Sequence, residues 1–198
     1  MDGPGDATHA DDVAAIPTGI YPTLTWPTAD PTRMALLVVD LQVLCAAPGA
    51  GMFAAAARLG VPEVLDDYRR RLEGTTIPNA ARLMAAARKR GVPVISTRIR
   101  STTTDGSDRV GCHIALGIHV PPDDPGGEFI SEVAPNDGEV VIDKTTSDAF
   151  IATDLEERLR ALDRDQLIVV GVLTHECVES TVRHGADLGL AVTVVEDA

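Results

Sequence analysis

Three residues that can carry acid–base and nucleophilic chemistry each follow a short apolar run. They are, in chain order, Asp40 after 35–39, Lys144 after 139–142 and Cys177 after 167–173. A cysteine that opens a helix has its thiolate favoured by free backbone N–H groups, and a nearby ammonium lowers the thiol pKa further. The set predicts a Cys177 nucleophile, an Asp40 general base and a Lys144 electrostatic stabiliser.

Each of these residues also has an ordinary structural interpretation. An aspartate at a strand end often caps a turn, a lysine there is usually solvated, and a lone cysteine often serves as a small core residue. Only their joint placement favours chemistry. In open parallel sheets the ligand crevice lies outside the carboxyl ends of the strands, so we expect all three side chains at one edge of a sheet.

The elements that must position these residues alternate along the chain. The apolar runs are continuous in β-branched residues, which is typical of parallel strands covered on both faces, and they span 35–39, 92–99, 139–142, 167–173 and 190–195. Helical patterns separate the runs, one from Pro78 to Gly91, one over 153–162 and one from Cys177 to about Leu188. The order predicts an α/β domain with right-handed crossovers.

The remaining segments are less regular. We interpret 1–33, rich in Asp, Gly, Pro and Thr, as an extended N-terminal arm, and 34–198 as the single domain. Apolar residues in the second half of the arm are expected to anchor it, namely Ile20, Tyr21, Leu24 and Trp26. Segment 45–76 fits either short helices or a long flap, and 100–137 is expected to be a large functional loop.

Composition excludes several function classes. The chain has 198 residues, with 17 Lys and Arg against 30 Asp and Glu, and this net charge of -13 disfavours nucleic-acid and membrane-surface partners. Apolar residues make up 44%, too many for a disordered chain, yet no run approaches the roughly 20 residues of a membrane span. No basic start followed by an apolar stretch suggests a secretory signal, and three widely spaced cysteines are a poor disulfide framework. We expect a soluble, cytoplasmic protein.

Residues near strand ends are candidates for the substrate pocket. They are Gln42, Arg98, Phe150 and His175, although a surface ion pair for Arg98, core packing for Phe150 and a solvated turn for His175 fit equally well. No metal is expected, since the histidines from His113 onward lack zinc-site spacing. His175, Glu176 and Cys177 resemble a ligand cluster, but adjacent residues diverge in direction and do not easily share one ion. Neither a dinucleotide fingerprint nor a P-loop occurs, so no cofactor is expected.

Three strings resemble the isochorismatase-like cysteine hydrolases: LLVVDLQ (36–42), DKTTSDAF (143–150) and GVLTHECVESTV (171–182). TRIRSTTTDGSDR (97–109) and LGIHVP (116–121) resemble loops of an amidase branch that includes ureidoacrylate and N-carbamoyl amidases. The resemblance covers roughly 34–198. It implies a Rossmann-like parallel sheet sandwiched by helices, an Asp40–Lys144–Cys177 triad and metal-independent hydrolysis of a C–N bond through a thioester.

The resemblance also implies finer features of the site. A non-proline cis peptide is expected at Val172–Leu173, with the N–H groups of Leu173 and Cys177 forming an oxyanion hole. Nicotinamidases of this superfamily bind a metal through histidines soon after the first strand, and this chain has none between His9 and His113. Many relatives are dimers or tetramers, so a homo-oligomer is expected. Members usually continue beyond the equivalent of Ala198 with another helix and often a strand, so either the chain is shortened or a partner completes the sheet edge.

The substrate remains open between several classes. A small amide or lactam is favoured, including a cationic lactam antibiotic such as streptothricin, which one family member opens and which the acidic composition would suit. A ureido or carbamoyl compound is the alternative. Vinyl-ether hydrolysis, the isochorismatase reaction, needs no thiol nucleophile, and Cys177 argues against it. A non-catalytic binding module is the remaining alternative.

Overall fold

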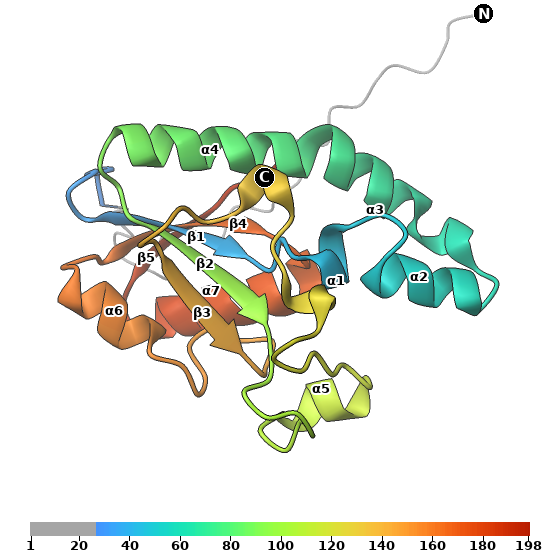
Figure 1. Cartoon of the computed structure of the whole chain (residues 1–198). Coiled ribbons are helices and arrows are strands. Elements are labelled where there is room, and N and C mark those ends of the chain that lie inside the picture. The colour runs from blue at the N-terminus through green and yellow to red at the C-terminus, as the bar shows by residue number, and fades with distance from the viewer. Residues whose placement is uncertain (1–26) are drawn as a thin grey trace, which may run out of the picture.

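The structure, a computed structural model, describes residues 27–198 (Figure 1). The predicted anchors of the arm, residues 20–26, lie outside this range. The described end of the arm contacts the domain, because the Asp30 N–H donates to Gln166 Oε1 at 3.0 Å and Arg33 forms an ion pair with Asp165.

Five parallel strands form one sheet in the order β3-β2-β1-β4-β5. Their bounds are β1 Met34–Val39, β2 Val94–Ile99, β3 Val140–Lys144, β4 Gln166–Gly171 and β5 Ala191–Val194. All five predicted strands are therefore present, and the predicted α/β fold is confirmed. The chain leaves β1 toward β2 and β3, then returns on the other side through β4 and β5, so the sheet switches direction between β1 and β4.

Helices cover both faces of the sheet (Figure 1). On one face, Leu37 and Val39 of β1 pack in a cluster with Leu155 of α6 and Val178. The alternate residues of β1, such as Leu36, pack on the other face with residues of α4. The helices are α1 Val43–Ala46, α2 Gly51–Arg58, α3 Asp66–Arg71, α4 Ile77–Lys89, α5 Gly111–Ala115, α6 Leu155–Ala161 and α7 Glu179–Asp187.

The two uncertain segments have defined structures. Segment 45–76 is largely helical, and from α3 the chain continues through a π-helical turn, η2 Leu72–Thr76, into α4 without a break. The loop between β2 and β3 holds α5 and two short 3₁₀ helices, η3 Pro125–Gly127 and η4 Ser131–Val133. A further 3₁₀ helix, η1 Pro62–Leu65, precedes α3. Among the helices of residues 27–198, none has the length and apolar character needed to cross a membrane.

One glycine allows β4 to end tightly against β1. Gly171 has φ +115, and a Cβ added there would lie 2.1 Å from the carbonyl oxygen of Val39. Directly after it, the Val172 N–H donates to the same Val39 carbonyl at 2.9 Å. The loop that follows β4 is therefore fixed beside the residue that follows β1, which is Asp40.

Candidate active site

Asp40 lies at the switch point of the sheet, directly after β1. Its backbone has φ +51, and its side chain is fully buried. Oδ1 accepts a hydrogen bond from the Thr97 hydroxyl at 2.8 Å, which holds the carboxylate in one orientation. Thr97 belongs to β2, the neighbouring strand, so two adjacent strands position this acid.

Lys144 reaches the same place from the last residue of β3. Its ammonium lies 2.7 Å from Asp40 Oδ2 and 3.3 Å from Cys177 Sγ, and it donates to the Thr146 carbonyl at 2.9 Å. The side chain is only 1% exposed. The chain has two lysines, Lys89 and Lys144, and the other is exposed. A buried ammonium is costly unless paired, and these three contacts supply its partners.

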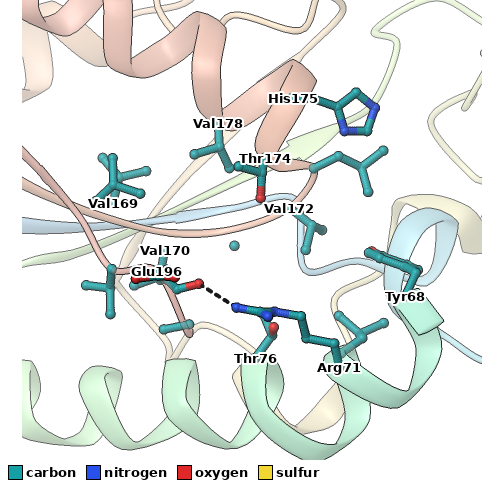
Figure 2. Close-up of a pocket in the computed structure, with 16 residues that line it drawn as sticks. Tyr68, Arg71, Thr76, Val169, Val170, Val172, Thr174, His175, Val178 and Glu196 are labelled. Carbon is teal, nitrogen blue, oxygen red and sulfur yellow. Dashed lines mark hydrogen bonds between the residues drawn. The ribbon is translucent and has the colours of Figure 1, made fainter. Parts of the chain in front are cut away.

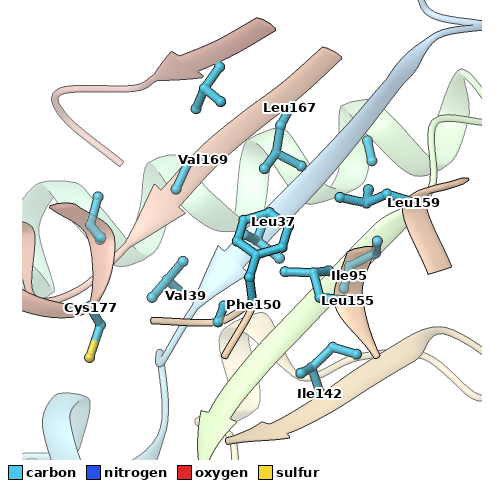
Figure 3. Close-up of a cluster of buried hydrophobic side chains, with 14 of the residues drawn as sticks. Leu37, Val39, Ile95, Ile142, Phe150, Leu155, Leu159, Leu167, Val169 and Cys177 are labelled. Carbon is cyan, nitrogen blue, oxygen red and sulfur yellow. The ribbon is translucent and has the colours of Figure 1, made fainter. Parts of the chain in front are cut away.

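Cys177 lies in a π-helical turn, η5 Thr174–Val178, between β4 and α7. Its side chain is 3% exposed and lies at the edge of the core cluster drawn in Figure 3, beyond Val39. Although apolar neighbours cover most of it, Sγ contacts the Lys144 ammonium. The structure therefore brings together the three residues that the sequence analysis chose as a triad.

The electrostatics of the thiol differ from the sequence-based expectation. Burial, and next the negative charge of Asp40, raise the pKa of the Cys177 thiol well above its usual range, and Lys144 opposes this only in part. The expected lowering of this pKa was wrong, because a helix start and a lysine do not compensate for a buried site beside a carboxylate. Burial lowers the pKa of Lys144, but the charges of Asp40 and Cys177 outweigh it, so that pKa is raised. Both shifts favour the protonated form, a thiol at Cys177 and an ammonium at Lys144.

The backbone before Cys177 has the expected form. The peptide bond between Val172 and Leu173 is cis. The Leu173 carbonyl accepts hydrogen bonds from the N–H groups of Glu176 and Val178, at 3.1 and 3.2 Å, and this fixes the start of the turn. Within residues 27–198, the Leu173 N–H donates to no backbone carbonyl. This donor is available to another acceptor.

Gln42 and Arg98 have structural partners. The Gln42 amide donates to the carbonyls of Ile99 (3.0 Å) and Gly126 (2.8 Å) and accepts from the Ile99 N–H (2.6 Å), so it ties loops together. Arg98 pairs with Asp143 at 2.5 Å and stacks on the Phe129 ring, 5.3 Å from the ring centroid. Both side chains are occupied without a substrate, and the ion-pair interpretation of Arg98 describes what is seen.

Phe150 and His175 do not join the triad either. Phe150 is a buried member of the core cluster and packs against His184, with 5.1 Å between ring centroids. His175 is exposed and lines a pocket of about 340 Å³ (Figure 2). That pocket also touches Leu173, but it is lined by none of the three triad residues. Arg71 of α3 crosses it and donates to the Glu196 carbonyl at 3.3 Å.

Sequence reasoning missed several residues around the triad. The Thr97 hydroxyl, inside β2, donates to Asp40, and the carbonyl of Thr146, two residues after β3, accepts from Lys144. Their place on an apolar strand or just after one was the available signal. His113 is buried, and it lies close enough to Lys144 and Asp40 to be affected by their charges. No sequence signal marked His113, because it arrives through the long loop after β2.

Fold and site together define a three-layer α/β protein with a carboxylate, an ammonium and a thiol at the switch point of its sheet. The Isochorismatase domain matches residues 34–198, and the chain belongs to this family.

Individual relatives agree with this assignment. N-carbamoylsarcosine amidase of Arthrobacter sp is 37% identical over 113 residues, which cover 54% of this chain and 43% of that protein. Ureidoacrylate amidohydrolase of Variovorax paradoxus is 28% identical over 180 residues, which cover 83% and 67%. The chain spans less than two thirds of several curated relatives that it matches.

Solved structures show the same fold. A cysteine hydrolase from Pseudomonas syringae has a TM-score of 0.72 at 29% identity, over 88% of this chain and 75% of that one. N-carbamoylsarcosine amidase from Thermoplasma acidophilum has a TM-score of 0.63 at 26% identity, over 84% and 83%.

Proposed function

We propose that the protein is a cysteine hydrolase that cleaves the C–N bond of a small amide or lactam through a thioester. The observation that carries this proposal is the Lys144 ammonium, buried and placed 2.7 Å from Asp40 Oδ2 and 3.3 Å from Cys177 Sγ. A structural core has no need of an acid, a base and a thiol in contact. In nucleophilic catalysis by a thiol, the carboxylate can take the thiol proton and the ammonium can stabilise the thiolate.

Each group has a defined task in the reaction. Asp40 accepts the thiol proton as Sγ attacks the carbonyl carbon, so the S–C bond forms while the C=O electron pair moves to oxygen. The oxyanion is stabilised by the N–H groups of Leu173 and Cys177. The tetrahedral adduct collapses, the C–N bond breaks, and protonated Asp40 gives its proton to the leaving nitrogen. A water molecule then gives its proton to Asp40 and attacks the thioester, and the acid product leaves as the proton returns to sulfur.

The raised pKa of Cys177 fits this sequence. A thiol that stays neutral at rest transfers its proton only when a substrate carbonyl is present, and the nearby Asp40 carboxylate is the acceptor. Lys144 then stabilises the thiolate as it forms, since its ammonium already contacts Sγ. No step needs a metal or another cofactor.

The names of relatives support C–N bonds as the target. Two of them are an N-carbamoylsarcosine amidase and a ureidoacrylate amidohydrolase, so ureido and carbamoyl compounds are the second candidate class. The net charge of -13 favours a cationic substrate, such as a streptothricin-type lactam. We further propose that the protein is cytoplasmic, forms a homodimer or homotetramer, and needs neither nucleic acid nor a membrane. Light scattering of the purified chain tests the oligomeric state.

The test is a panel of amides, lactams and ureides with product mass analysis. The wild type is expected to hydrolyse one class, and a covalent acyl adduct is expected on Cys177 after rapid quenching. Cys177→Ser and Lys144→Met should lose turnover, whereas Lys89→Met, which changes the exposed lysine, should keep it. Hydrolysis that survives in Cys177→Ser without an adduct would instead indicate the vinyl-ether type of chemistry. Absence of turnover on every class, together with a Cys177 no more reactive than free cysteine, would leave a binding module.

A further inference from the structure

A second cluster of ligand-type side chains lies beside the nucleophile. Cys112 and His113 of α5 and Glu176 of η5 place a thiol sulfur, a ring nitrogen and a carboxylate oxygen within 4.8 Å of one another. The cluster joins the long loop after β2 to the turn that carries Cys177. Neither Cys112 nor Glu176 belongs to the triad, and the proposed reaction uses none of the three.

His113 gives an independent indication that something binds here. Its side chain is fully buried, and neither ring nitrogen has a hydrogen-bond partner among the described residues. A buried polar group left without a partner destabilises the folded state. Buried histidines in folded proteins normally have a partner, so this ring is arranged for one that the chain itself does not supply.

A shared hydroxyl orients the other two groups. Ser147 Oγ donates to Glu176 Oε1 at 3.1 Å and lies 3.4 Å from Cys112 Sγ. Outer partners of this kind commonly fix the side chains that hold a metal. The thiol and the carboxylate are thereby held on the same side, facing His113.

We propose that Cys112, His113 and Glu176 bind one Zn²⁺ ion. Thiolate, imidazole and carboxylate are the ligands zinc takes, and around one tetrahedral ion such atoms lie about 3–4 Å apart. Cys112 is exposed and Glu176 half-buried, so small side-chain rotations close the remaining gap. The Cys112 thiol gives its proton to solvent on binding. Thiolate and carboxylate then balance the charge of the ion, with water in the fourth position.

The position of the site indicates inhibition as its consequence. Glu176 directly precedes Cys177, and His113 lies near enough to Lys144 and Asp40 to be affected by their charges. An ion held there takes space next to the nucleophile. Zinc therefore regulates this site and is not needed for its reaction.

Cobalt substitution tests the site without any turnover. The metal-free full chain, titrated with Co²⁺, should develop a thiolate-to-cobalt charge-transfer band that saturates at one equivalent, and Zn²⁺ should abolish the band. Cys112→Ser should lose the band and Glu176→Gln should weaken binding. Cys177→Ser and Glu179→Gln, the latter changing an exposed acid on the next turn, should keep it. Circular dichroism checks that each variant is folded.

Two results would overturn the proposal. One is a wild-type chain that develops no band. The other is a band that survives Cys112→Ser and disappears in Cys177→Ser, because the nucleophile would then be the thiolate ligand. Both outcomes are independent of whether the chain hydrolyses amides.

Discussion

The charges around Cys177 act on its thiol in opposite directions, and two substitutions separate them. Asp40 raises the thiol pKa and Lys144 lowers it. Asp40→Asn should therefore move the titration of Cys177 to lower pH, and Lys144→Met should move it to higher pH. Both variants are expected to lose turnover, so activity alone cannot distinguish their effects.

The magnitude follows from the geometry. Two unit charges separated by 3.3 Å, the distance from Lys144 Nζ to Cys177 Sγ, interact by about 5 kcal/mol at an effective dielectric constant of about 20. Since one pH unit corresponds to about 1.4 kcal/mol, the ceiling of the shift is roughly 3–4 units. Side-chain relaxation and water entry reduce it, and we expect at least about one unit for Lys144→Met and a shift of opposite sign for Asp40→Asn.

The assay is the rate of alkylation by iodoacetamide as a function of pH, followed by mass spectrometry of the peptide that contains Cys177. Only the thiolate reacts, so at any given pH a lower thiol pKa gives a faster alkylation, and the rate profile shifts along the pH axis with the thiol pKa. Lys89→Met is the matched control and should give the wild-type profile. Lys144→Met leaves the buried Asp40 carboxylate unpaired. The double variant Asp40→Asn/Lys144→Met, which has neither charge, is therefore also measured, and its alkylation profile should fall between those of the single variants. Equal profiles for both single variants, or shifts in the same direction, would refute the reasoning.

Three further predictions concern stability. Burial, and then the charge of Asp40, raise the pKa of Cys45 to about 12. The folded state therefore keeps the thiol proton to higher pH than the unfolded state does. The free energy of unfolding should fall by up to about 1.4 kcal/mol per pH unit as pH rises above about 9. Urea unfolding should show a shallower decline in Cys45→Ala, and an unchanged slope would contradict this. Gln42→Leu should lower the free energy of unfolding by about 3 kcal/mol, at roughly 1 kcal/mol for each of its three hydrogen bonds. Unchanged unfolding together with a raised KM would instead make Gln42 a substrate ligand. Thr97→Val should lower the free energy of unfolding by about 1.5–3 kcal/mol, because it removes a hydrogen bond to the buried Asp40 carboxylate. Thr97→Ser keeps the hydroxyl and should keep the stability. Equal stability of the two variants would count against a stabilising role of this hydrogen bond.

The sheet could be predicted because its signal is local. Strands buried on both faces need continuous β-branched runs, and each of the five runs is a strand. The ends of β1, β3 and β4 then meet at one edge by topology, so Asp40 and Cys177 could be placed together before any distance was known. Resemblance to a family added the cis bond at Val172, which no local pattern of residues indicates.

The surroundings of the triad could not be predicted in the same way. The roles of Gln42 and His113 depend on a loop of irregular conformation whose path no periodicity encodes. The direction of the Cys177 pKa shift was missed for a related reason. Neighbouring charges can be counted from the sequence, but burial, which is the largest cause of the shift, depends on how the surrounding elements pack.

The buried pair of Asp40 and Lys144 is better explained by chemistry than by stability. Burying two charges costs several kcal/mol for each ion, and well-packed apolar residues often serve as well or better. In this chain one of only two lysines is nevertheless placed in the core, and its ammonium contacts a carboxylate, a backbone carbonyl and a sulfur at once. A pair kept only for packing would not need to include that sulfur. The contact between Lys144 and Cys177 is therefore the feature on which the proposed reaction rests.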